Sequence, residues 1–159
     1  MERHAVAYGY STTVGLSQAA ALEATRAALA AEGFGVLCEI DVEATLRARI
    51  GADVGPYVIL GACNPSLAYA AIGIDRDIGL LLPCNVVVYA APEPGRTVVS
   101  VIDPERIIAL AEANGLLPIA GDASARLLRV LRAVENVVPV AAPPSLVRGD
   151  SAEVAEEIC

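Results

Sequence analysis

Residues 85–102, NVVVYAAPEPGRTVVSVI, decide the fold class. Two runs rich in β-branched residues, 85–91 and 97–102, flank a Pro-Glu-Pro-Gly segment at 92–95. β-Branched residues favour strands, and a short connection containing Pro and Gly is typical of a hairpin. The stretch therefore predicts two neighbouring antiparallel strands, which favours a mainly antiparallel sheet over a doubly wound parallel one.

Strands and helices are predicted in mixed order before this hairpin, and two helices are predicted after it. Alternating residues predict further strands over 4–10, 34–40 and 57–62, the first ending in polar turn residues at 11 and 12. Capping residues followed by apolar residues at helical spacing predict helices over 17–32, 41–50, 64–74, 103–114 and 122–136. This order predicts an α+β domain whose sheet has five strands rather than four.

The strand over 34–40 carries the first cysteine. Alternation along a strand places Val36, Cys38 and Ile40 on one face, so we interpret Cys38 as a small core residue.

Size and composition predict a globular domain followed by a tail. The chain has 159 residues, of which 55% are hydrophobic and 19% charged, and a chain of this size buries a core without disulfides or a structural metal. We assign the domain to residues 1–137. Residues 138–159 are rich in Pro and Ala and then acidic, with a short helix expected at 151–158, and we interpret them as a tail.

Charge and hydropathy disfavour two classes of partner. The formal net charge is −8, and the basic residues, all Arg, are scattered among 19 acidic ones, so no nucleic-acid partner is expected. No apolar run is long enough to span a membrane, and the N-terminus does not resemble a signal peptide. We therefore expect no membrane partner and a cytoplasmic protein, whose four cysteines stay reduced.

Three stretches carry a family likeness. They are EGFGVL at 32–37 followed by EID at 39–41, ILGACNP at 59–65, and GLLLPCNV at 79–86. In this order and at this spacing, the region 6–136 resembles the domain-of-unknown-function family 302 (DUF302). The resemblance implies a fold of the TATA-binding-protein-like class, in which a curved antiparallel sheet is backed by helices. It also implies a homodimer, whereas activity and cofactor stay unknown.

Two of these stretches supply the candidate site, which comprises Cys63, Asn64, Pro65, Cys84 and Asn85. Cys63 stands where a strand gives way to a helix, and the partial positive charge of a helix start favours a thiolate. Asn64 and Pro65 suit the cap and first turn of that helix. If the strands beside Cys63 and Cys84 are neighbours, both thiols face one pocket.

Each of these residues also has a simpler structural interpretation. Cys63 suits a tight corner between strand and helix, and Cys84 suits the start of a buried strand. His4, the single histidine, would have to approach Cys63 to form a catalytic pair, and we expect it on the surface instead. No metal-ligand spacing is present, so no metal site is predicted.

Two functions stay open, and the sequence does not decide whether the chain is an enzyme. The first is a dimeric binding module for a small ligand or a protein partner, which suits an aliphatic core without a catalytic constellation. The alternative is a thiol-dependent protein that handles redox equivalents, sulfur or a soft metal through Cys63 and Cys84.

Overall fold

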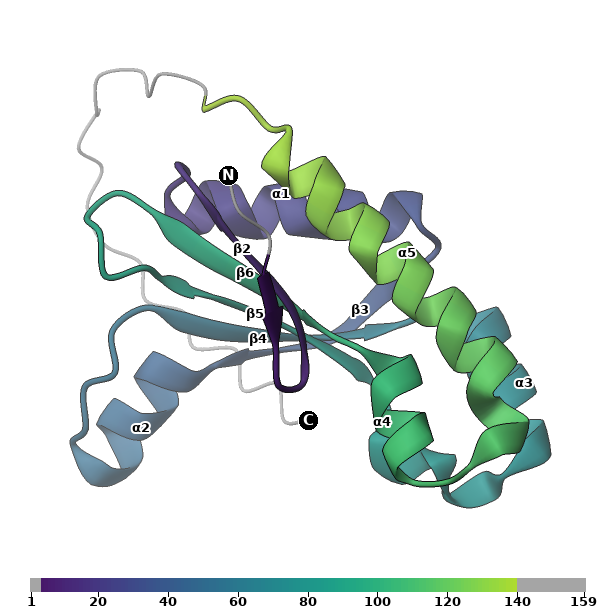
Figure 1. Cartoon of the computed structure of the whole chain (residues 1–159). Coiled ribbons are helices and arrows are strands. Elements are labelled where there is room, and N and C mark those ends of the chain that lie inside the picture. The colour runs from purple at the N-terminus through teal and green to yellow at the C-terminus, as the bar shows by residue number, and fades with distance from the viewer. Residues whose placement is uncertain (1–3, 140–159) are drawn as a thin grey trace.

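The computed structural model describes residues 4–139, in which strands and helices alternate irregularly (Figure 1). The strands are β1 (His4–Val6), β2 (Gly9–Val14), β3 (Gly35–Asp41), β4 (Tyr57–Cys63), β5 (Cys84–Ala90) and β6 (Thr97–Ile102). The helices are α1 (Gln18–Ala31), α2 (Val42–Ile50), α3 (Pro65–Ile74), α4 (Pro104–Leu110) and α5 (Leu117–Glu135), with short 3-10 helices η1 (Arg76–Leu81) and η2 (Asn114–Leu116).

The strands form one sheet in the order β1-β2-β6-β5-β4-β3, and all neighbouring pairs are antiparallel. The predicted hairpin is its centre, where Val86 pairs with Val101 and Ala90 with Thr97. The α+β prediction, with a mainly antiparallel sheet backed by helices, is confirmed.

The N-terminal segment forms two strands instead of the predicted one, so the sheet has six strands. The chain turns between Val6 and Gly9, and Ser11, predicted in a turn, lies within β2. Pairing with β6 explains the difference, because Ser11 lies opposite Ser100 and their hydroxyl oxygens are 2.7 Å apart. Tertiary pairing here overrides the local preference of Ser and Thr for turns.

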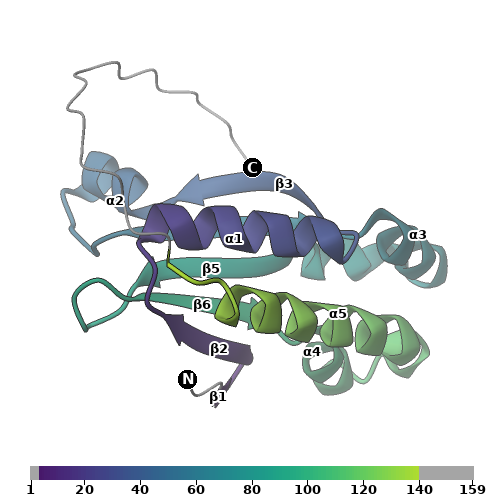
Figure 2. The ribbon, with the colours of Figure 1, turned by 90° about the horizontal axis from the view of Figure 1, so that it is seen from above.

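The sheet has two faces of different character. Figures 1 and 2 show α1 and α5 lying together over one face. The main core fills the space between these helices and the sheet, and its fully buried side chains include Leu29, Leu60, Val86, Val99 and Leu131. The opposite face is flanked by α2 and α4 at its two ends (Figure 1).

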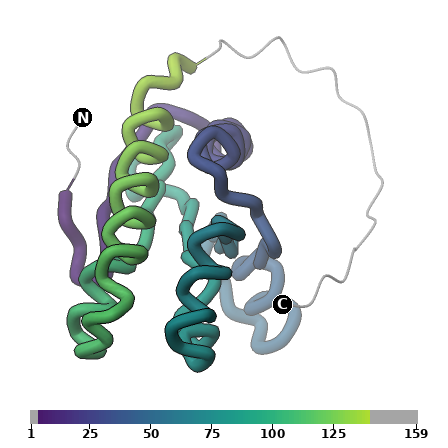
Figure 3. The backbone as a smooth tube through the Cα atoms, turned by 90° about the vertical axis from the view of Figure 1, so that its right-hand side faces the viewer, coloured from purple at the N-terminus to yellow at the C-terminus, as the bar shows by residue number. Residues whose placement is uncertain are grey.

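A second, smaller core lies beyond one end of the sheet. It is formed by Ala71, Ile78, Ile108, Leu116 and Ala120, which come from α3, η1, α4, η2 and α5. Figure 3 views the molecule from this end, with α3 in front and α5 beside it. Four short elements meet here around the N-terminal part of α5, where the candidate site lies.

A β-bulge in β3 corrects one prediction about faces. The pairing of β3 with β4 shifts between Val36 and Cys38, so that Val36 lies opposite Ala62 and Cys38 lies opposite Gly61. Ala62 is buried in the main core, whereas Gly61 belongs to the other face. The prediction that Val36, Cys38 and Ile40 share a face is therefore wrong, because one extra residue reverses the alternation.

Two expectations concern regions beyond these elements. The predicted tail at 138–159 falls almost wholly outside the described residues, as does its expected helix at 151–158. Among the described residues, no helix has the length and apolar character needed to cross a membrane.

Candidate functional site

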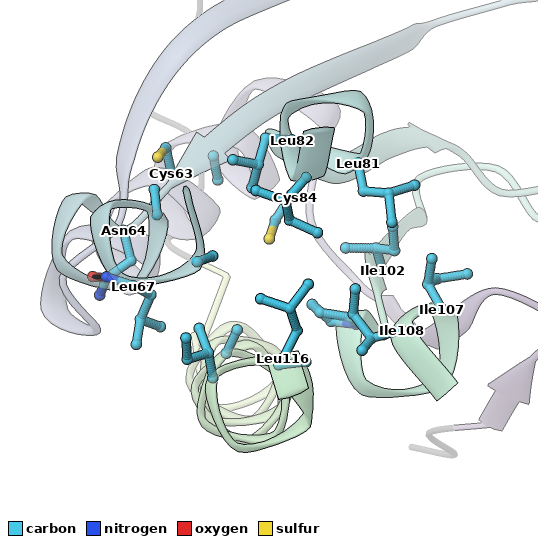
Figure 4. Close-up of a pocket in the computed structure, with 18 of the residues that line it drawn as sticks. Cys63, Asn64, Leu67, Leu81, Leu82, Cys84, Ile102, Ile107, Ile108 and Leu116 are labelled. Atoms are coloured by element: carbon cyan, nitrogen blue, oxygen red, sulfur yellow. Dashed lines mark hydrogen bonds between the residues drawn. The ribbon is translucent and has the colours of Figure 1, made fainter. Parts of the chain in front are cut away.

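An apolar pocket lies between the ends of β4 and β5 and the surrounding helices (Figure 4). Its cavity measures about 70 Å³. The described residues of its walls are aliphatic apart from the Phe34 ring, two thiols and one amide. The lining residues are Phe34, Ala62, Cys63, Asn64, Leu67, Ala68, Ala71, Ile78, Leu81, Leu82, Cys84, Ile102, Pro104, Ile107, Ile108, Leu116, Ile119, Ala120 and Ala123.

Cys84 places its thiol inside this pocket. It is the first residue of β5 and lies opposite Ala62, which is buried on the helix-covered face of the sheet. Residues opposite each other on neighbouring strands share a face, and Figure 4 shows the Cys84 sulfur pointing into the cavity. Burial raises the pKa of Cys84 to about 11, and the proximity of Cys63 adds to the increase. The thiol is therefore protonated at neutral pH.

Cys63 also lines the pocket but is oriented differently. It is the last residue of β4 and is half-buried, and its sulfur points away from the centre of the cavity (Figure 4). Burial raises the pKa of the Cys63 thiol, which is the opposite of the direction expected from the adjacent helix start. The structure brings Cys63 and Cys84 to one pocket without directing the two sulfurs toward each other.

Asn64 and Pro65 play the parts predicted for them at the start of α3. The Asn64 side-chain oxygen accepts a hydrogen bond of 3.2 Å from the backbone N–H of Leu67, and Pro65 occupies the first turn. Gly33 lies against the same amide, because a Cβ added at Gly33 would stand 3.0 Å from the Asn64 side-chain nitrogen. Asn64 lines the pocket, whereas Pro65 is exposed and does not.

Asn85 faces the other side of the sheet. Successive residues of a strand point to opposite faces, so Asn85 and the preceding Cys84 lie on different faces of the sheet. Asn85 pairs with Gly61 and lines a separate cleft. The predicted site is therefore divided: Cys63, Asn64 and Cys84 share the apolar pocket, and Asn85 belongs elsewhere.

Sequence reasoning missed the pocket wall that comes from η1, α4 and η2. Ile108 lies in the helix predicted over 103–114, whereas Ile78 and Leu116 lie outside every predicted element, and all three reach the cavity through tertiary packing. Helical spacing predicts that Ile108 is buried, but no local signal indicates which cavity these residues line.

Other candidate groups do not join the site. His4 lies on the edge strand β1, separated from β4 by β2, β6 and β5, and its side chain is exposed. Cys63 and Cys84 are free thiols, whereas Cys38 is disulfide-bonded, so the prediction that all four cysteines stay reduced is wrong for Cys38. The described residues contain no cluster of three or more His, Cys, Asp or Glu side chains that would hold a metal ion.

Comparisons with known proteins give a consistent result. The family model described as "Domain of unknown function DUF302" matches residues 10–134. The crystal structure of uncharacterized conserved protein DUF302 from Bacillus stearothermophilus is similar with a TM-score of 0.74 and 31% sequence identity, over 81% of this chain and 99% of that chain. No curated protein matches the chain.

Proposed function

The chain belongs to the DUF302 family, and we propose that it is a binding module whose pocket at Cys84 takes a small apolar ligand or the apolar end of a larger one. The observation that carries this proposal is an open cavity whose described walls are apolar, mostly aliphatic with the Phe34 ring, and in which the Cys84 side chain points inward as a neutral thiol. Pockets that select ligands combine apolar walls with few polar groups.

The size of the cavity limits what enters it. A cavity of about 70 Å³ is smaller than the roughly 150 Å³ of an engineered apolar cavity that binds benzene. The pocket therefore suits a short branched or linear alkyl group rather than a fused ring system.

The surface around the pocket supports a ligand that extends beyond it. Leu81 lines the cavity and is 42% exposed, and the adjacent Leu80 is 87% exposed. Apolar side chains left in water beside an apolar cavity favour an occupant that covers both. An alkyl chain lying across η1 with its end in the cavity meets this requirement, as does an apolar side chain of a protein partner.

A homodimer is the second part of the proposal. It rests on the family resemblance, and the large exposed apolar side chains at this end of the molecule, Tyr69 and Leu110 among them, are consistent with it. Sedimentation equilibrium of the full chain tests it, because a mass of one chain at micromolar concentration contradicts a dimer.

The binding test uses 1-hexanol as an apolar probe and a matched pair of variants. Ala68 lines the pocket from α3, whereas Ala70 lies on the same helix, is exposed and does not line it. Ala68→Leu adds three carbons to the cavity, and Ala70→Leu adds the same three to the surface. We expect 1-hexanol to shift the methyl NMR signals of Ile78, Ile108 and Leu116, with affinity at least about tenfold weaker in Ala68→Leu and unchanged in Ala70→Leu. Equal affinity in both variants contradicts the proposal.

Thiol chemistry is the second candidate, because Cys84 points into the pocket and Cys63 also lines it. The raised pKa of each thiol counts against a nucleophile or soft-metal ligand at neutral pH, since the thiolate is the reactive form. Alkylation by iodoacetamide, followed by peptide mass at each cysteine, separates the candidates. Rapid modification of Cys84 at pH 7 in the native protein favours thiol chemistry, and protection until the pH approaches its raised pKa favours the binding module.

A further inference from the structure

The face of the sheet opposite α1 and α5 contains a cleft that is distinct from the Cys84 pocket. Its volume is about 510 Å³, within the roughly 300–1,000 Å³ typical of ligand sites. Its floor comes from β4, β5 and β6, and Tyr8, in the turn between β1 and β2, also lines it. A solvated face of an antiparallel sheet normally carries polar side chains, whereas here tyrosines and Val87 line the floor and rim.

One end of the cleft is aromatic. Tyr57 on β4 and Tyr89 on β5 lie opposite each other, with ring centroids 5.3 Å apart and ring planes 13° from parallel. Both side chains are half-buried, and both line the cleft. A stacked tyrosine pair forms a flat wall, against which an aromatic ring or the apolar face of a sugar ring packs favourably.

The other end of the cleft offers hydrogen-bonding groups. The exposed side-chain amide of Asn85 makes no hydrogen bond with any other described residue, so its two N–H groups and its oxygen are available. Tyr8 is 73% exposed and brings a phenol to the cleft. Asn85 precedes Tyr89 by four residues on β5, which separates the two ends by about 13 Å at 3.3 Å per residue.

None of the described residues that line the cleft is charged, in a chain whose formal net charge is −8. A charged group entering the cleft would lose hydration without gaining a counter-charge. An uncharged ligand incurs no such cost and gains ring packing at one end and hydrogen bonds at the other.

We propose that this cleft is a second binding site, for a neutral molecule about 13 Å long that has an aromatic ring at one end and hydroxyl or amide groups at the other. The ring packs against Tyr57 and Tyr89, its linker lies over Val87, and its polar end bonds with Asn85 and Tyr8. Because Cys84 and Asn85 point to opposite faces of β5, this site opens on the other face of the sheet from the apolar pocket, and Ile102 is the described residue that lines both.

The test measures binding of 4-methylumbelliferyl β-D-glucoside to the full chain by equilibrium dialysis, with ¹H–¹⁵N NMR to locate it. This probe is neutral and carries a fused aromatic ring at one end and a sugar at the other. We expect saturable binding with a Kd of about 1 mM or lower and a shifted side-chain amide signal of Asn85. Absence of saturable binding, or shifts confined to α3 and α4, overturns the proposal.

Four variants sharpen this test. Tyr8→Ala and Asn85→Ala each remove an exposed group from the cleft and are expected to weaken binding at least about fivefold. Tyr69→Ala is the matched control, because Tyr69 is 85% exposed on α3 and does not line the cleft. Ala68→Leu, which fills the apolar pocket, is expected to leave glucoside affinity unchanged. Equal loss in Tyr69→Ala and Tyr8→Ala shows non-specific binding and overturns the proposal.

Discussion

Replacing Asp103 by alanine is expected to lower the free energy of unfolding by about 2.5–4 kcal/mol. Asp103 is 6% exposed, and its carboxylate accepts a hydrogen bond of 2.7 Å from the Ser124 hydroxyl on α5. It also caps α4 by accepting from the backbone N–H of Arg106 at 3.4 Å, and its other oxygen lies 3.8 Å from the Arg106 guanidinium. One carboxylate thus joins α4 to α5.

The magnitude follows from the two bonds that are lost. A hydrogen bond to a buried charged group contributes about 1.5–3 kcal/mol, and loss of a helix cap costs about 1 kcal/mol. We give the ion pair with Arg106 little weight because the two groups are 3.8 Å apart and solvent reaches the partly exposed guanidinium. Asp103→Asn keeps an acceptor for both bonds and loses only the charge, so its expected cost is about half as large.

Urea denaturation followed by circular dichroism measures these values. Asp122→Asn is the matched control, since Asp122 is exposed on α5 and pairs with Arg126 four residues later, and its expected cost is below about 0.5 kcal/mol. A cost for Asp103→Ala as small as that of Asp122→Asn would refute the reasoning. Because α4 carries Ile107 and Ile108 to the apolar pocket, Asp103→Ala should also weaken 1-hexanol binding.

Two further predictions concern the pocket. The pKa of Cys84 is about 11 in the folded protein against 9.0 for an ordinary cysteine. The unfolded chain therefore loses this proton first, and stability is full below pH 9.0 and falls, by up to about 3 kcal/mol, as pH rises toward 11. Tyr10, whose pKa is raised first by the charge of Asp103 and then by burial, contributes to the same fall, so the measured quantity is the difference in pH dependence between wild type and Cys84→Ala. An identical alkaline slope in the two proteins contradicts the assignment to Cys84. Gly33→Ala is expected to cost about 1–2 kcal/mol more than Gly51→Ala, as measured by thermal and urea unfolding. Both glycines have positive φ, but a Cβ at Gly33 would meet the Asn64 amide at 3.0 Å, whereas one at Gly51 has no atom within 4 Å; equal costs would show that the amide moves aside freely.

Sequence signals within a few residues were enough to predict the hairpin and the helix starts, whose hydrogen bonds join residues close in the chain. The hairpin of β5 and β6 follows from β-branched runs around a turn, and the start of α3 follows from Asn64 and Pro65, because caps and turns are satisfied by residues a few positions away. The division of the N-terminal segment into two strands and the bulge at Val36 were missed because the pairing partner decides them. No residue near Ser11 indicates that Ser100, far along the chain, will lie opposite it.

For the candidate site, too, the sequence predicted part of the arrangement and tertiary structure decided the rest. The sequence singled out Cys63 and Cys84, and strand order alone brought both to one pocket, since β4 and β5 are neighbours. It grouped Asn85 with Cys84, although alternation along β5 sends their side chains to opposite faces and into separate cavities. It also favoured a Cys63 thiolate from the helix start, whereas burial raises the pKa of that thiol.

The sequence by itself determined the family, the α+β class, the central hairpin and the caps that start most helices. The family follows from three motif stretches, and the other features rest on composition and on contacts between residues close in the chain. Only the tertiary structure decided that η1, α4 and η2 close an apolar cavity around Cys84, and that the opposite face carries a tyrosine-lined cleft. The physical reason is that burial and enclosure depend on which distant segments pack together, and helical or strand spacing indicates that a side chain is buried without indicating against what.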